Sequence, residues 1–335
     1  MKKSYFIKMS VTDKLEQDYP GIKRNIYTLK LSRRFNIVSR FLKILPKTRS
    51  LNSSQIKFAN YAWNILGKLL PKASSIKWED LQIGELNARL YYSENQNASG
   101  TILYFHGGGY CLGSINTHHS FLTYLSKICN SQVLAVNYRL APKNPYPAAL
   151  HDALESYHWL LDVTNAPIWL AGDSAGGGLA LALLLAIKNQ EVKMPRGVFL
   201  LSPWLDLTPC YHGKKDQKIY DDLLHQDAVL KAAQLYAGNH DAYSPLMSPL
   251  KGNLKGLPPI IIQVSKDELL YDESLDLFKA IQKVRGPAVL QVWTKMFHSW
   301  PYFAGFLPES RKAMTHIAVL IQQLNKAFLL WRREN

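Results

Sequence analysis

Apolar positions along the chain recur with two periods. From residue 83 onward, short apolar runs of strand length alternate with longer segments whose apolar residues repeat at helical spacing. Strands are expected at residues 83–92, 101–105, 133–137, 168–171, 197–202, 258–265 and 288–294. Helices are expected at residues 151–161, 179–187, 226–236 and 312–333. This alternation predicts an α/β protein whose mainly parallel sheet is covered by helices on both faces.

The first 75 residues have a different pattern. An amphipathic helix that ends before Pro46 is predicted by apolar residues at spacings of three and four, namely Phe35, Val38, Phe41, Leu42 and Leu45. A second periodic segment covers residues 56–70 and ends at Pro71. We expect residues 1–75 to form an N-terminal helical cap. The two alternatives are helices that only pack on the core and a basic helical surface that contacts a membrane.

Residues 76–335 are expected to form one large α/β domain. Within it, residues 204–250 are irregular and contain Pro209, Pro245 and Pro249 around the helix expected at 226–236. Long segments of this kind inside a compact domain are usually functional, so we interpret 204–250 as a lid-forming insertion.

Composition favours a packed globular protein with an unevenly distributed positive charge. The chain has 335 residues, of which 47% are hydrophobic and 19% charged, and its net charge is +15. Residues 1–50 contain 13 Lys and Arg against 3 Asp and Glu. A basic segment is consistent with a solvated helical face or with an anionic membrane partner. Nucleic acid is not expected as a partner, because no zinc pattern or RNA-binding signature accompanies the charge.

The cysteines and the apolar segments indicate the cellular compartment in which the protein is expected. Cys111, Cys129 and Cys210 are odd in number and widely spaced, so they predict neither a disulfide framework nor a metal site. Met1-Lys2-Lys3 resembles the start of a signal peptide, but the apolar stretch after it is too short. No apolar run approaches the ~18 residues of a membrane span. We therefore expect a soluble cytoplasmic protein, and the sequence leaves open whether it forms a homodimer.

The most informative segment is Gly172-Asp173-Ser174-Ala175-Gly176. It lies between an apolar run of strand length and a Leu/Ala-rich run of helical length. A Gly-x-Ser-x-Gly sequence between a strand and a helix is typical of a nucleophile elbow, in which a sharp turn exposes the serine hydroxyl. The segment therefore predicts nucleophilic chemistry by Ser174 on an acyl group.

A serine nucleophile requires a base and an acid that orients the base. Asp267 follows the strand expected at 258–265, and His298 follows the strand expected at 288–294. Both therefore lie at the carboxyl ends of parallel strands, and the order Ser, Asp, His is that of an α/β-hydrolase. We predict a triad of Ser174, Asp267 and His298. Asp272 is an alternative acid, and Asp267-Glu268 could instead cap a helix.

An oxyanion-binding loop is predicted upstream of the elbow. His106-Gly107-Gly108-Gly109 follows the strand expected at 101–105. Consecutive glycines allow backbone N–H groups to approach a substrate closely. We expect the oxyanion donors to be Gly108, Gly109 and Ala175, with His106, Gly107 and Asp173 as supporting members of the two motifs.

Over about residues 100–310 the chain resembles the hormone-sensitive-lipase-like branch of the α/β-hydrolase fold esterases. Besides the elbow, the shared motifs are His106-Gly107-Gly108-Gly109, Tyr138-Arg139-Leu140-Ala141-Pro142, Ser202-Pro203-Trp204, Gly256-Leu257-Pro258-Pro259, Asp267-Glu268-Leu269-Leu270 and Phe297-His298-Ser299-Trp300. The resemblance implies the same triad, an N-terminal helical cap, a pocket for short or medium acyl chains, and no cofactor. We expect residues 76–335 to be the catalytic domain and expect no metal. Glu268 stands where many members of the family carry proline.

These features predict a serine carboxylic-ester hydrolase, an enzyme of the carboxylesterase or lipase kind. We expect it to act on small-molecule esters with short to medium acyl chains, through an acyl-enzyme intermediate. The same machinery would serve a lactone, an acetyl ester or a formamide. A non-catalytic ligand-binding protein on this fold is a further alternative. The residues Arg33, Arg34, Arg40 and Lys43 also favour weak contact with an anionic membrane surface.

Overall fold

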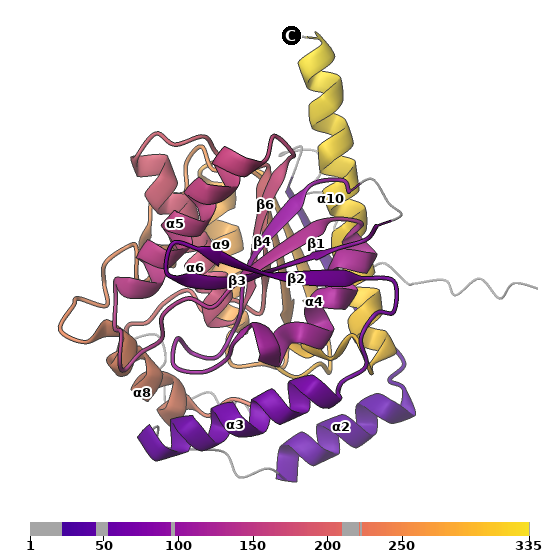
Figure 1. Cartoon of the computed structure of the whole chain (residues 1–335), viewed down its shortest axis with the longest axis vertical. Coiled ribbons are helices and arrows are strands. Elements are labelled where there is room, and N and C mark those ends of the chain that lie inside the picture. Colours follow the sequence, from indigo (N-terminus) through magenta and orange to yellow (C-terminus); the bar gives the residue numbers. More distant parts are fainter. Residues whose placement is uncertain (1–21, 45–52, 95–97, 210–220, 222, 335) are drawn as a thin grey trace, which may run out of the picture.

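The computed structural model describes residues 22–44, 53–94, 98–209, 221 and 223–334. Met1-Lys2-Lys3, Pro46 and Cys210, on which parts of the sequence interpretation depend, lie outside these residues. The described residues form one twisted sheet with helices on both faces (Figure 1).

The sheet has nine strands in the described part of the chain. They are β1 (Ile22–Tyr27), β2 (Lys77–Ile83), β3 (Leu86–Tyr92), β4 (Thr101–Phe105), β5 (Gln132–Val136), β6 (Ile168–Asp173), β7 (Gly197–Leu201), β8 (Ile260–Ser265) and β9 (Ala288–Trp293). Their spatial order is β1-β9-β8-β7-β6-β4-β5-β3-β2. Only the β2–β3 and β3–β5 pairs are antiparallel. The predicted mainly parallel α/β architecture is therefore confirmed.

Helices cover the sheet and one end of the molecule. They are α2 (Arg33–Ile44), α3 (Ser53–Leu69), α4 (Ile115–Cys129), α5 (Ala148–Val163), α6 (Ala175–Asn189), α8 (Gln226–Ala237), α9 (Tyr271–Lys283) and α10 (Pro308–Glu334), with short 3-10 turns η1 (Pro249–Lys251) and η2 (Trp300–Phe303). In Figure 1, α2 and α3 lie at the lower end of the molecule, and α8 lies beside them.

Two hydrophobic cores form because strand side chains alternate between the two faces of the sheet. In β4, Leu103 and Phe105 belong to the core shared with α5, α6 and α9. Ile102 and Tyr104 point the other way, into the core shared with α4 and α10. Strands buried on both faces explain the nearly continuous apolar runs seen in the sequence.

The N-terminal region differs from the expectation in one respect. Residues 22–27 form β1, which pairs in parallel with β9 at the sheet edge, so residues 1–75 are not wholly a helical cap. The two predicted cap helices correspond to α2 and α3, although Leu45 lies outside the described residues. The segment 83–92, expected as one strand, is the end of β2, a turn at Gly84 and β3.

Helix α4 was not predicted. Its buried positions include His118, His119, Ser120, Thr123 and Ser126, so an apolar periodicity is hard to see in the sequence. Ser114 caps its first turn, and the side chains of Ser114 and Thr117 form a reciprocal capping box. Searched across its described residues, the chain has no helix both long enough and apolar enough to cross a membrane.

Candidate active site

Ser174 occupies a sharp turn between β6 and α6. Its backbone has φ 52° and ψ −122°, which is a strained conformation for a residue with a side chain. The turn is held by a 2.9 Å hydrogen bond from the Ser174 N–H to the Leu201 carbonyl. A Cβ at Gly176 would collide with the Phe105 carbonyl oxygen, so glycine is required where α6 passes β4. The elbow predicted from the sequence therefore has the expected backbone form.

Ser174 lines a cavity of about 310 Å³. The glycine loop after β4 borders the same cavity through Gly107, Gly108 and Gly109, and the loop after β9 borders it through His298 and Ser299. The cavity is also lined by residues of the two regions that were predicted to cover the site. These are Leu42 from α2, Gln55, Ala59 and Trp63 from α3, and Leu223, Leu224, His225, Ala228, Val229 and Ala232 from the segment that includes α8. Both regions predicted to cover the site therefore contribute to its lining.

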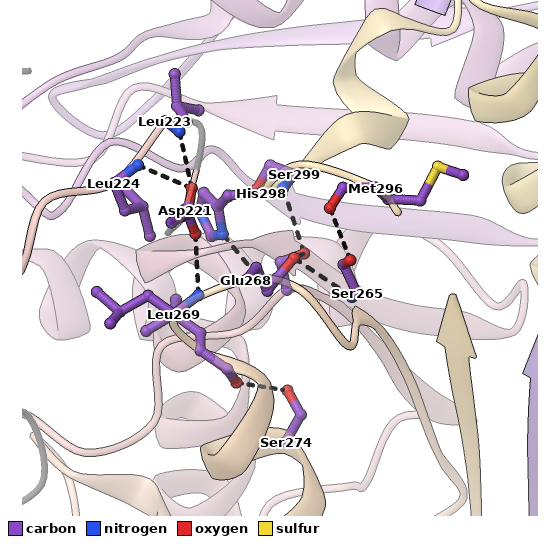
Figure 2. Close-up of polar contacts among 12 residues, drawn as sticks. Asp221, Leu223, Leu224, Ser265, Glu268, Leu269, Ser274, Met296, His298 and Ser299 are labelled. Atoms are coloured by element: carbon purple, nitrogen blue, oxygen red, sulfur yellow. Dashed lines mark hydrogen bonds and ion pairs between the residues drawn. The ribbon is translucent and has the colours of Figure 1, made fainter. Parts of the chain in front are cut away.

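His298 contacts Glu268 and not Asp267. The Nδ1 atom of His298 lies 3.4 Å from Glu268 Oε1, and both side chains are buried (Figure 2). Because a carboxylate only accepts, Nδ1 carries the proton, which leaves Nε2 as the basic nitrogen. Nε2 is 3.2 Å from the hydroxyl of Ser299.

The second oxygen of Glu268 is also fully engaged. It accepts a 2.8 Å hydrogen bond from the Ser202 hydroxyl and a 3.3 Å bond from the Ser265 N–H. Ser202 in turn accepts a 3.3 Å hydrogen bond from the Ser299 N–H. The carboxylate is therefore fixed by the ends of β7, β8 and the loop that carries the histidine.

The expectation for Asp267 is corrected by these contacts. Asp267 is exposed, and its carboxylate accepts a 2.5 Å hydrogen bond from the backbone N–H of Lys295. It ties the loop after β8 to the turn after β9, which is a structural contact. The alternative acid, Asp272, lies in the first turn of α9. Glu268 lies one residue further from the end of β8 than Asp267. The side chain of Glu268 is buried, whereas that of Asp267 is exposed.

Burial and the ion pair act together on the two titratable groups. Burial raises the pKa of Glu268, and the hydrogen bond from His298 offsets part of that rise. Burial alone would lower the pKa of His298, but the hydrogen bond and the charge of Glu268 outweigh it and raise that pKa. Glu268 therefore favours the protonated imidazole, as is needed when a histidine accepts a proton from a nucleophile.

Asp221 connects this pair to the cavity wall. One carboxylate oxygen accepts hydrogen bonds of 2.8 and 2.9 Å from the N–H groups of Leu223 and Leu224, which line the cavity. The other oxygen accepts a 2.9 Å bond from the N–H of Leu269, next to Glu268 (Figure 2). Asp221 is only 2% exposed. Sequence reasoning missed it, because an Asp in an irregular segment gives no sign of burial.

The glycine loop adopts a conformation that side chains disfavour. Gly108 has φ +124°, and a Cβ there would collide with the Leu112 carbonyl oxygen. Within the described residues, the N–H groups of Gly108 and Gly109 donate to no protein acceptor. The N–H of Ala175 begins α6, where backbone donors lack intrahelical partners. Of the three predicted oxyanion donors, Gly108 and Gly109 thus line the cavity, and Ala175 directly follows Ser174.

Asp173 links the elbow to the glycine loop. Its carboxylate accepts hydrogen bonds of 2.8 Å from the Gly107 N–H and 2.7 Å from the Tyr104 hydroxyl, and it lies 3.2 Å from Nε2 of His118. Burial alone would raise the pKa of Asp173, but His118 and these hydrogen bonds outweigh burial and lower it to about 2. Asp173 therefore stays ionised and holds Gly107 in place. The role of His118 was not foreseen.

His106 also stabilises the glycine loop. Its ring stacks on Tyr138 with centroids 4.3 Å apart, and the Tyr138 hydroxyl donates to the His106 carbonyl at 2.6 Å. Burial, and then the nearby His118, lower the pKa of His106 to about 3. It is therefore neutral near pH 7, and its Nδ1–H donates to the Gly107 carbonyl at 2.9 Å.

The two cysteines in the described residues are free and buried. Burial raises the pKa of Cys111 and of Cys129 to about 12. A thiol with such a pKa is almost entirely protonated near pH 7, so neither is a reactive nucleophile. Both belong to the hydrophobic cores, and Cys210 lies outside the described residues.

Comparison with known proteins agrees with this geometry. Residues 102–302 match the model of a family with the alpha/beta hydrolase fold. An esterase of Acinetobacter venetianus is 31% identical over 292 residues, which cover 85% of this chain and 96% of that protein. An acetyl-hydrolase of Streptomyces hygroscopicus is 38% identical over 216 residues, which cover 64% of this chain and 72% of that protein.

Solved structures give the same result. The crystal structure of an esterase from the bacterial hormone-sensitive lipase family matches with a TM-score of 0.79 and 30% identity, covering 89% of this chain and all of the other. Fold and site thus define an enzyme of the α/β-hydrolase class, a carboxylesterase- or lipase-like hydrolase. Within that class, this chain belongs to the hormone-sensitive-lipase-like branch.

Proposed function

We propose that this chain hydrolyses short- to medium-chain acyl esters, acetyl esters among them, through a triad of Ser174, His298 and Glu268. The observation that carries the proposal is the buried pair of Glu268 and His298, whose histidine lines the same cavity as Ser174. A cavity of about 310 Å³ is at the small end of the range for small-molecule sites, which supports compact substrates. The acetyl-hydrolase among its relatives supports acetyl esters.

The reaction follows from the roles of these groups. Ser174 Oγ attacks the ester carbonyl carbon while its proton moves to Nε2 of His298. The oxyanion accepts hydrogen bonds from the N–H groups of Gly108, Gly109 and Ala175. His298 then gives its proton to the departing alcohol, which leaves an acyl group on the serine. Water attacks that acyl group and gives a proton to Nε2 of His298. The bond between the acyl carbon and Ser174 Oγ then breaks, the histidine returns its proton to Oγ, and the carboxylic acid is released.

Glu268 has two tasks in this sequence. Its hydrogen bond to Nδ1 fixes the tautomer in which Nε2 is the base, and its charge stabilises the imidazolium. Asp173 has a separate task, because it holds the Gly107 end of the oxyanion loop against the elbow. We infer that α2, α3 and the segment 204–250 cover the site and determine which esters enter.

An ester panel tests the proposal. Purified protein is assayed on p-nitrophenyl esters of increasing acyl length, together with a lactone and a formamide. We expect the greatest kcat/KM among the short and medium esters and loss of turnover in Ser174→Ala. Turnover that survives in Ser174→Ala would refute the serine mechanism. Preference for the lactone or the formamide would refute the substrate class and leave the mechanism in place.

A further inference from the structure

Six large apolar side chains are exposed on the two cap helices α2 and α3. They are between 42% and 76% exposed and make up six of the eleven exposed large apolar residues in the described part of the chain. We call them the cap face: Ile37, Phe41, Phe58, Tyr61, Ile65 and Leu69. Clustered exposed apolar side chains of this kind mark an interaction surface.

The cap face is a regular feature of both helices. Ile37 and Phe41 are four residues apart on α2, and the four residues of α3 are separated by three, four and four. Such spacings place them along one side of each helix. The other side of α3 carries the buried Ile56 and the cavity-lining Trp63, so this helix is apolar on two sides. Only one of those sides packs on the protein.

The charged side chains of α2 and α3 indicate which kind of partner the cap face would bind. Every ionisable Asp, Glu, Lys or Arg side chain of α2 and α3 is basic, and all six are exposed: Arg33, Arg34, Arg40, Lys43, Lys57 and Lys68. An apolar stripe whose charged neighbours are all Lys or Arg is typical of helices that lie in the interface of an anionic membrane. Tyr61 adds an amphipathic ring of the type found at that depth.

The position of the cap face relates it to catalysis. The same two helices supply Leu42, Ala59 and Trp63 to the lining of the active-site cavity. They form one end of the molecule, away from the free end of α10 (Figure 1). A lipid surface in contact with the cap face would therefore lie close to the covered side of the site.

We propose that the cap face binds the surface of an anionic lipid bilayer and brings the active site to esters that partition into membranes. Apolar side chains enter the acyl boundary, and the basic side chains contact lipid phosphates. The binding itself does not depend on the proposed catalytic residues. Only its consequence for the choice of substrate rests on the proposed function.

Vesicle co-sedimentation tests the apolar part of this proposal. The full chain carrying Ser174→Ala, which leaves vesicle lipid intact, is mixed with vesicles of phosphatidylcholine alone or of equal parts phosphatidylcholine and phosphatidylglycerol. We expect binding to the anionic vesicles only. The pair Phe58→Gln and Leu69→Gln is expected to weaken it about tenfold or more. The matched pair Val163→Gln and Val319→Gln, at exposed apolar positions of α5 and α10, should bind as the parent does.

Charge reversal tests the electrostatic part. Arg40→Glu with Lys57→Glu is expected to weaken binding to anionic vesicles about tenfold or more. Lys255→Glu with Lys283→Glu changes the net charge equally at exposed positions outside the cap helices and should have little effect. All four pairs should hydrolyse a short soluble ester normally when Ser174 is restored, which separates this proposal from the catalytic one.

Three results would overturn the proposal. The first is no binding to either kind of vesicle, and the second is equal binding to both kinds. The third is a dimer in sedimentation velocity that the Phe58→Gln and Leu69→Gln pair converts to a monomer, without vesicle binding. That last result would assign the cap face to a second copy of this chain.

Discussion

Adjacent carboxylates at the end of β8 have opposite environments. Glu268 is buried, and its two oxygens accept from His298, Ser202 and Ser265. Asp267 is exposed and accepts from the Lys295 backbone. A catalytic acid must hold the imidazole without competition from water, and only Glu268 meets that condition.

The pH dependence of hydrolysis follows from this contact. His298 must be neutral to accept the serine proton, so kcat/KM should rise with pH through the His298 pKa. Burial would lower that pKa, but Glu268 raises it, so the midpoint should lie above the ordinary value of 6.5. In Glu268→Gln the two largest raising contributions to the His298 pKa are lost, while burial and the weaker charges of Asp221 and Asp173 stay, so the midpoint should fall. A pH–rate profile of both proteins checks this, and an unchanged or higher midpoint in the variant would contradict it.

How far the site could be predicted depends on the residue. Ser174, His298 and the glycine loop follow from local motifs, because a sharp turn and a close backbone approach require particular residue types. The choice between Asp267 and Glu268 depends on which side chain turns inward, and two neighbours in one turn look alike in a sequence. The one available signal was that Glu268 departs from the proline expected at this position from the family resemblance.

At the scale of elements, the cavity wall and the loop that carries the acid are joined by one side chain. Asp221 accepts hydrogen bonds from the backbone N–H groups of the cavity-lining Leu223 and Leu224 and from that of Leu269, next to Glu268. The position of this part of the cavity wall and the position of Glu268 are therefore coupled through one buried carboxylate. Separate measurements of KM and kcat distinguish an effect of this coupling on substrate binding from an effect on the chemical step.

Asp221→Asn tests that coupling. The amide replaces one acceptor oxygen by a donor that faces a backbone N–H, and an unpaired buried donor costs about 1–3 kcal/mol. We expect KM to rise and kcat/KM to fall about tenfold, with the acid limb of the pH profile retained. Steady-state kinetics on a short ester measures both constants. Unchanged KM together with loss of kcat would instead place Asp221 with the triad.

Other elements differ in how clearly the sequence predicts them. The strands β4, β6, β7 and β8 are nearly continuous apolar runs and were predicted within a few residues. Strand β1 pairs with β9, more than 260 residues away, and its sequence, Ile22–Tyr27, alternates only weakly. Helix α4 buries histidines and hydroxyls that hydrogen-bond locally, so its core face is polar in sequence.

At the scale of the whole molecule, the parallel sheet explains why distant residues meet. The strands β4, β6 and β8 lie in the middle of the sheet and point the same way, so the loops after them share one edge. Helices α2 and α3 line the cavity at that edge through Leu42, Ala59 and Trp63, and they carry six basic side chains and no acidic one. The site and the cap face are therefore at the same end of the molecule.

We propose above all that Glu268 orients His298 so that it can activate Ser174. The decisive measurement is kcat on a short p-nitrophenyl ester for Glu268→Gln and Asp267→Asn, with Ser174→Ala as the floor. We predict a loss of about 10⁴-fold in Glu268→Gln, because the tautomer and charge support are lost, and near wild-type kcat in Asp267→Asn. The reverse ranking, or equal losses in the two variants, would refute the role of Glu268.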